Sequence, residues 1–73
     1  MKTLDLIPSG TEVIVKDIQA GCGLKSRLYG LGIFPGEKIK VIKNDQGPIL
    51  LKVGNTKLAI GRGEAKKILV EVV

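Results

Sequence analysis

The chain has 73 residues, with twelve Lys and Arg against seven Asp and Glu, and a formal net charge of +5. This length predicts a single domain over residues 1–73, with a core too small to surround a deep pocket, so binding is favoured over catalysis. A hydrophobic content of 44% argues against a disordered chain. The single cysteine, Cys22, excludes an internal disulfide and favours a reducing compartment. No apolar run is long enough for a membrane span or a signal peptide, so we expect a cytoplasmic protein without membrane insertion.

The first part of the chain predicts a turn followed by a strand. A short apolar lead-in at residues 4–7 ends in a turn at residues 8–10, where proline presets φ and glycine accepts a positive φ. Val13 and Val15 then alternate with other residues through 11–18, which predicts the first strand.

The next segment predicts one short helix with a glycine at each end. Leu24, Leu28 and Leu31 recur at i, i+4 and i+7, so they share the face that is expected to pack on the core. Gly32 is a suitable C-terminal stop, and Pro35 follows it. A helix of about eight residues does not persist alone in water, so the three leucines are expected to hold it in place.

The second half of the chain predicts four more strands joined by short turns. Segment 37–43 alternates, with Ile39 and Val41 inside and Lys38 and Lys40 in solvent. The other strands are expected at residues 49–53, 56–60 and 68–73, with a hairpin loop at 44–47, a hairpin turn at 54–55 and one helical turn within 61–67. About five strands with one short inserted helix are typical of a mainly β fold, a small, partly open SH3-like barrel.

The residues that usually carry chemistry are sparse. Histidine is absent and the carboxylates are scattered, which argues against a metal site. The glycines around Cys22 lack the third glycine of a dinucleotide motif, and Lys25-Ser26 lacks the glycine of a phosphate-binding loop. Cys22 has no second cysteine or histidine to activate it. We therefore expect no catalytic residues, no cofactor and no metal.

The exit of the helix is the candidate binding surface. Ile33 and Phe34 lie in a turn, where they either cap the core or protrude and dock onto a partner. Arg27 and Lys25 add positive charge beside them. The predicted partner-binding residues are Lys25, Arg27, Tyr29, Ile33 and Phe34.

Two alternatives remain open. The basic side chains make a nucleic-acid-binding small β-barrel the second function; they are Lys25, Arg27, Lys38, Lys40, Lys43, Lys52 and Lys57. Single strands are bound largely by stacking on aromatic rings, and Tyr29 and Phe34 are the only two, so no stable nucleic-acid complex is expected. A third function is stimulation of GTP hydrolysis in a partner by Arg27, since an arginine near a helix end can reach a phosphate.

The helix and its exit form a central motif of four short segments: Gly23-Leu24, Arg27-Leu28, Leu31-Gly32-Ile33 and Pro35-Gly36. This motif resembles that of a known family, the ferrous iron transport protein A (FeoA) family. Further matches to the family lie at Leu4, Pro8, Gly10, Gly47-Pro48-Ile49, Leu58-Ala59-Ile60, Glu64-Ala65, Ile68 and Val70. The resemblance implies an SH3-like barrel with a helical insertion. It also implies a cytosolic accessory protein that regulates or assists a ferrous iron permease, which carries a cytosolic G-protein domain, through protein contact. Incomplete closure of so small a barrel would leave strand edges for a weak homo-oligomer.

Overall fold

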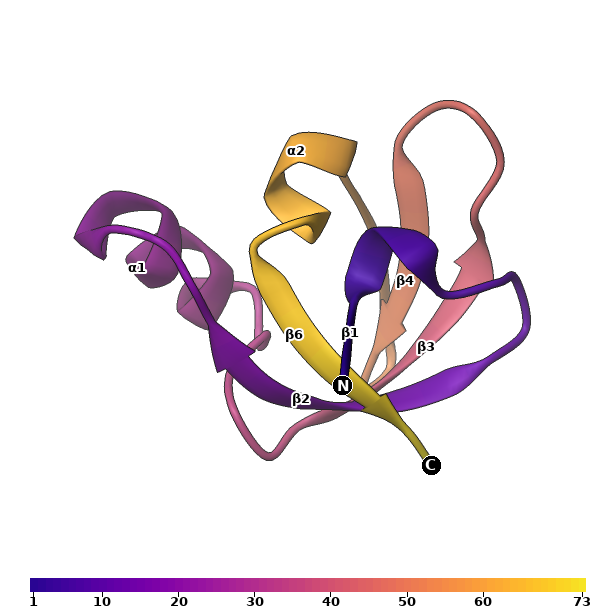
Figure 1. The fold of residues 1–73 in the computed structure, drawn as a ribbon, viewed down its shortest axis with the longest axis horizontal. Coiled ribbons are helices and arrows are strands. Elements are labelled where there is room, and N and C mark those ends of the chain that lie inside the picture. The colour runs from indigo at the N-terminus through magenta and orange to yellow at the C-terminus, as the bar shows by residue number, and fades with distance from the viewer.

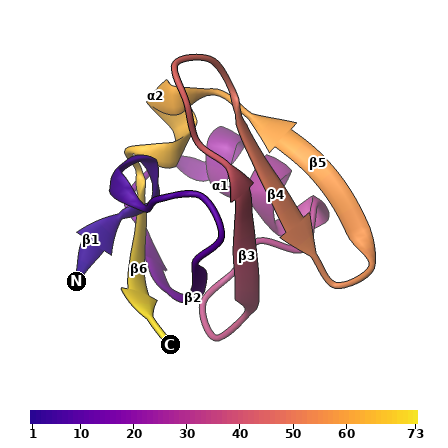
Figure 2. The same cartoon turned by 90° about the vertical axis from the view of Figure 1, so that its right-hand side faces the viewer.

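Residues 1–73 are all described in the computed structural model, and they form a mainly β fold (Figure 1). Six antiparallel strands make one sheet in the order β1-β6-β2-β3-β4-β5. The strands are β1 (Lys2–Thr3), β2 (Glu12–Ile18), β3 (Lys38–Lys43), β4 (Ile49–Val53), β5 (Thr56–Ile60) and β6 (Ile68–Val72). Strands β1 and β5 stand at the two ends of this order and do not pair with each other, so the curled sheet stays open, as predicted (Figure 2).

Three short helical segments interrupt the strands: η1 (Leu4–Leu6), α1 (Cys22–Gly30) and α2 (Arg62–Ala65). Segments η1 and α2 contact each other at one rim of the barrel, whereas α1 projects beyond the end of β2 (Figure 1). None of these helices has the length and apolar character needed to cross a lipid bilayer.

Alternating residues of the strands fill the interior of the barrel. Strand β2 buries Val13 and Val15, and β3 buries Ile39 and Val41. The lysines on either side of Ile39 in the sequence are exposed to solvent. This is the alternation that the sequence predicts for segment 37–43. Burial of one apolar face of each strand supplies the main driving force for this fold.

Two shifts of register bend the sheet. The pairing of β2 with β6 slips between Val15 and Asp17, and the pairing of β3 with β4 slips between Val41 and Lys43. An extra residue in one strand of an antiparallel pair increases the local twist and bends that strand. These irregularities help a sheet of short strands to curl around a single core.

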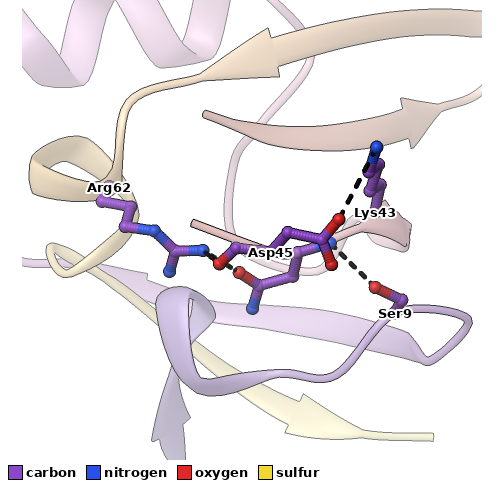
Figure 3. Close-up of polar contacts among 5 residues, drawn as sticks. Ser9, Lys43, Asp45 and Arg62 are labelled. Carbon is purple, nitrogen blue, oxygen red and sulfur yellow. Dashed lines mark hydrogen bonds and ion pairs between the residues drawn. The ribbon is translucent and has the colours of Figure 1, made fainter. Parts of the chain in front are cut away.

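The loop between β3 and β4 is fixed to the rim by Asn44. Its side-chain Nδ2 donates to the carbonyl oxygens of Asp5 at 2.9 Å and Ile7 at 2.6 Å, and its backbone N–H donates to Ser9 Oγ at 2.8 Å. The Asn44 Oδ1 accepts a hydrogen bond from the guanidinium of Arg62 in α2. The same guanidinium donates to the backbone carbonyl of Asp45 (Figure 3). One side chain therefore ties the N-terminal segment, the loop and α2 together.

The sheet has one short strand more than the about five that the sequence predicts. Strand β1 has two residues and pairs with β6, with Lys2 opposite Val70 and Thr3 opposite Leu69. A strand of two residues is too short to show alternation in the sequence. The structure contains all five strands that the sequence predicts, as β2 to β6. It also contains the predicted helix and the hairpin turn between β4 and β5.

Candidate functional site

The surface of the chain has three shallow depressions, all open to solvent. Their volumes are about 780, 290 and 360 Å³. The largest lies on the loop between β3 and β4 and has no hydrophobic lining residue. The depression of about 290 Å³ lies on α1 and combines the polar Lys25 and Ser26 with the more apolar Cys22 and Tyr29. No group of three or more His, Cys, Asp or Glu side chains comes together anywhere in the chain. The candidate site is the face of α1 and the segment after it, because the depression there combines polar and apolar side chains.

Helix α1 is held on the barrel by two leucines, and not by the three that the sequence predicts. Leu28 is fully buried and Leu24 packs against the core while partly exposed. Leu31 is 40% exposed, because the helix has already ended at Gly30 and the helical spacing no longer applies. The third apolar anchor is Ile33, which is fully buried.

A glycine stop turns the chain so that Ile33 enters the core. The N–H of Gly32 donates to the carbonyl of Tyr29 at 3.0 Å, and the N–H of Ile33 donates to the carbonyl of Leu28 at 2.9 Å. These two bonds, with Gly32 at φ +89°, form a Schellman motif, in which an apolar pair, here Ile33 and Leu28, commonly packs together. A Cβ on Gly32 would lie 3.1 Å from Val53 Cγ1, so the glycine also allows close approach to β4.

A second turn follows directly and fixes Phe34. The N–H of Glu37 donates to the carbonyl of Phe34 at 3.1 Å, with Pro35 and Gly36 between them and Gly36 at φ +94°. Proline followed by a positive-φ glycine is the signature of a type II turn. The N–H of Gly36 also donates to the carbonyl of Val15 at 2.8 Å, which attaches the turn to β2. The backbone on both sides of Phe34 is therefore constrained.

Two aromatic rings lie side by side at this exit. The ring centroids of Tyr29 and Phe34 are 6.0 Å apart and the ring planes are tilted by 54°, a favourable aromatic arrangement. Tyr29 is 44% exposed and Phe34 is 37% exposed. With the exposed Leu31 these two residues form the helix-exit surface, a name used below for Tyr29, Leu31 and Phe34.

The predicted partner-binding residues do not all reach the surface. Ile33 is 0% exposed, so its assignment as a binding residue is corrected: the Schellman motif points it inward and makes it part of the core. Phe34, its neighbour, points outward. Lys25 is half-buried and lines the depression beside Tyr29.

Arg27 has a partner within the chain that the sequence did not reveal. Its guanidinium donates to Glu64 Oε2 in α2, 37 residues away. Glu64 Oε1 accepts the backbone N–H of Gly61 at 3.1 Å, which fixes the carboxylate. Arg27 thus ties α1 to α2 rather than standing as an unpaired charge. Reaching a phosphate in a partner would require it to give up this ion pair.

Solved structures share this architecture. The crystal structure of an iron uptake regulatory protein (FeoA) is 32% identical, with a TM-score of 0.92 over 99% of this chain and 96% of that chain. The FeoA of Stenotrophomonas maltophilia, solved with zinc, is 30% identical with a TM-score of 0.85, over 97% of this chain and 91% of that chain, and it is described as a prokaryotic SH3 domain protein. The crystal structure of ScaR with bound Zn2+ is 20% identical, with a TM-score of 0.90 over 100% of this chain and 37% of that chain, which shows the fold alone. The fold is that of an SH3-like β domain.

Sequence comparison identifies the family. The model described as "FeoA domain" matches residues 2–72. A protein of Methanocaldococcus jannaschii named "Putative Fe(2+) transport protein A" is 49% identical over 71 residues, which are 97% of this chain and 87% of that protein. The chain belongs to the FeoA domain family.

Proposed function

We propose that this chain is a cytoplasmic accessory protein of ferrous iron transport, and that it regulates or assists a ferrous iron permease by direct contact through the helix-exit surface. The family and the names of the relatives, which refer to Fe(2+) transport and iron uptake, support the first part of this proposal. The Stenotrophomonas protein is described as a candidate ferrous iron transport activating factor. A permease with a cytosolic G-protein domain is the proposed partner.

The observation that carries the proposal is the exposed pair Tyr29 and Phe34 on a constrained backbone. Large aromatic side chains dominate the energetics of many protein interfaces. A surface that is already ordered before binding loses little conformational entropy when the partner arrives. The Schellman motif and the type II turn provide this order here, because they fix the chain on both sides of Phe34.

Charge complements this apolar contact. Lys25 lies beside Tyr29, and the chain carries a net charge of +5, which favours encounter with an acidic surface. The shallow depressions favour contact over catalysis, so the proposed activity is not enzymatic. We also expect no stable nucleic-acid complex, because the planes of the Tyr29 and Phe34 rings are tilted by 54° to each other and do not form a flat platform for stacked bases.

The test is a binding measurement with the purified cytosolic domain of a ferrous iron permease. Replacing Tyr29 and Phe34 together with alanine is expected to weaken binding by at least about 30-fold, since a buried aromatic hot spot contributes about 2 kcal/mol or more. The control is Leu6→Ala, which removes another exposed apolar side chain, 65% exposed, from η1. Binding by the double variant equal to that of the control, with both chains folded by circular dichroism, would refute the role of the helix-exit surface.

A further inference from the structure

Three lysines lie next to one another across the outer face of three adjacent strands. Lys40 of β3 is directly opposite Lys52 of β4, and Lys52 is directly opposite Lys57 of β5. All three side chains are exposed, on the face opposite to the core. We call Lys40, Lys52 and Lys57 the lysine row.

At one end of the lysine row, no acidic residue of a neighbouring strand balances the positive charge. Like charges directly opposite each other on neighbouring strands destabilise a sheet. None of the three ion pairs of the chain includes a member of the row. Glu12 of β2 is opposite Lys40, so an acidic residue flanks the row on that side. Beyond Lys57, at the other end, no strand follows.

The row therefore ends at an open strand edge. Figure 2 shows β5 at the margin of the sheet. The hairpin between β4 and β5 has a two-residue turn, with Val53 opposite Thr56. In the antiparallel pattern that follows this turn, the backbone N–H and C=O groups of Lys57 and Ala59 point away from β4. No backbone hydrogen bond joins β5 to any segment other than β4. These groups are free to pair with another extended chain.

We propose that the edge of β5 binds an extended acidic segment of a partner protein as an additional antiparallel strand, with a carboxylate opposite Lys57. A carboxylate in that place would flank the lysine row as Glu12 does at the far end. Leu58 is half-buried on the inner face of β5. It would contact an apolar side chain next to that carboxylate in the bound segment. The segment recognised is thus one in which acidic and apolar residues alternate, the pattern of β-strand addition. This site is separate from the helix-exit surface and does not depend on it.

Other occupants fit this edge less well. The segment that follows α1 packs against the face of β4 opposite to the lysine row, where Gly32 meets Val53. The lysine row therefore has no aromatic platform beside it on which nucleic-acid bases could stack. A second copy would bring two chains of net charge +5 together through β5 edges that each carry Lys57. Charge complementarity instead favours an acidic polypeptide.

The probe is a short fluorescent peptide of alternating glutamate and valine, titrated with the full chain and followed by anisotropy. We expect saturable binding at physiological salt. Lys52→Gln with Lys57→Gln should raise Kd about fivefold or more, since each exposed ion pair contributes a modest amount. Lys66→Gln with Lys67→Gln makes the same change of charge on exposed lysines outside the row and should leave Kd unchanged. Ala59→Pro removes an outward N–H at an edge position that tolerates proline, and should abolish binding.

A second measurement keeps the strand pairing testable if the proline variant unfolds. The same peptide with alternate backbone amides methylated retains its charge but cannot add as a strand, and it should not bind. Equal binding of the methylated peptide, or no binding of the unmodified one, would overturn the proposal. So would tighter binding of an oligonucleotide of the same charge, or self-association of the chain that Ala59→Pro abolishes. Unchanged peptide binding by Phe34→Ala would show that this edge acts apart from the helix-exit surface.

Discussion

Ile33 and Phe34 are neighbours in the chain, yet the structure predicts different consequences when each is replaced by alanine. Ile33 is 0% exposed, so Ile33→Ala removes three buried carbons at about 0.8 kcal/mol each and adds the cost of a cavity, which gives a loss of about 3–4 kcal/mol. A domain of this length has a total stability of about 4–11 kcal/mol. Phe34 is 37% exposed, and Phe34→Ala should cost about 1–2 kcal/mol, less than the value for a fully buried ring.

Urea denaturation followed by circular dichroism measures both losses. Ile33→Val serves as a graded control and should cost about 1 kcal/mol, because it removes a single buried methyl group. The slope of free energy against urea should stay the same for all variants, which shows that only stability changed. Equal losses for Ile33→Ala and Phe34→Ala, or a larger loss for Phe34→Ala, would contradict the inward and outward placement of these two residues.

Three further changes test how the site is supported. Asn44→Ala should cost about 2–3 kcal/mol in a urea titration, since three side-chain hydrogen bonds are lost from the rim; a loss below about 0.5 kcal/mol would contradict that role. Gly32→Ala should lower stability more than Gly36→Ala, because both glycines have a positive φ but only the first meets a β4 methyl group; equal thermal midpoints would argue against the close contact. Glu64→Ala should cost about 1 kcal/mol more than Arg27→Ala, since the Glu64 carboxylate also accepts the backbone N–H of Gly61 at the start of α2. Similar unfolding free energies for the two variants would show that this second hydrogen bond contributes nothing.

Local patterns were sufficient to predict most of the fold. The alternation around Ile39 and Val41 predicted β3 and its inward face, and the Gly54-Asn55 pair predicted the hairpin between β4 and β5. Gly32 was correctly identified as the helix stop. Each of these features depends on residues close together in the chain, where backbone preference and side-chain alternation are directly visible.

The errors and omissions concern contacts that only the assembled fold creates. Helical spacing places Leu31 on the buried face, but the turn at Gly32 ends that spacing and gives the buried position to Ile33. The ion pair of Arg27 with Glu64 joins residues far apart in the chain and leaves no local signal.

The lysine row was missed for the same reason. Lys40 was expected to face solvent, and all three lysines were named only as part of a larger basic set. Their alignment across three strands depends on the register, which shifts between Val41 and Lys43. A residue pattern within one strand cannot give the register between two paired strands.

The most direct test of the proposed function is a map of contacts on the isotopically labelled chain. The backbone amide resonances would be followed by NMR while the cytosolic domain of a ferrous iron permease is added. We expect the changes at Tyr29, Leu31 and Phe34 to be among the largest. No change at saturating concentrations, or changes confined to the rim formed by η1 and α2, would contradict a function carried out through the exit of the helix.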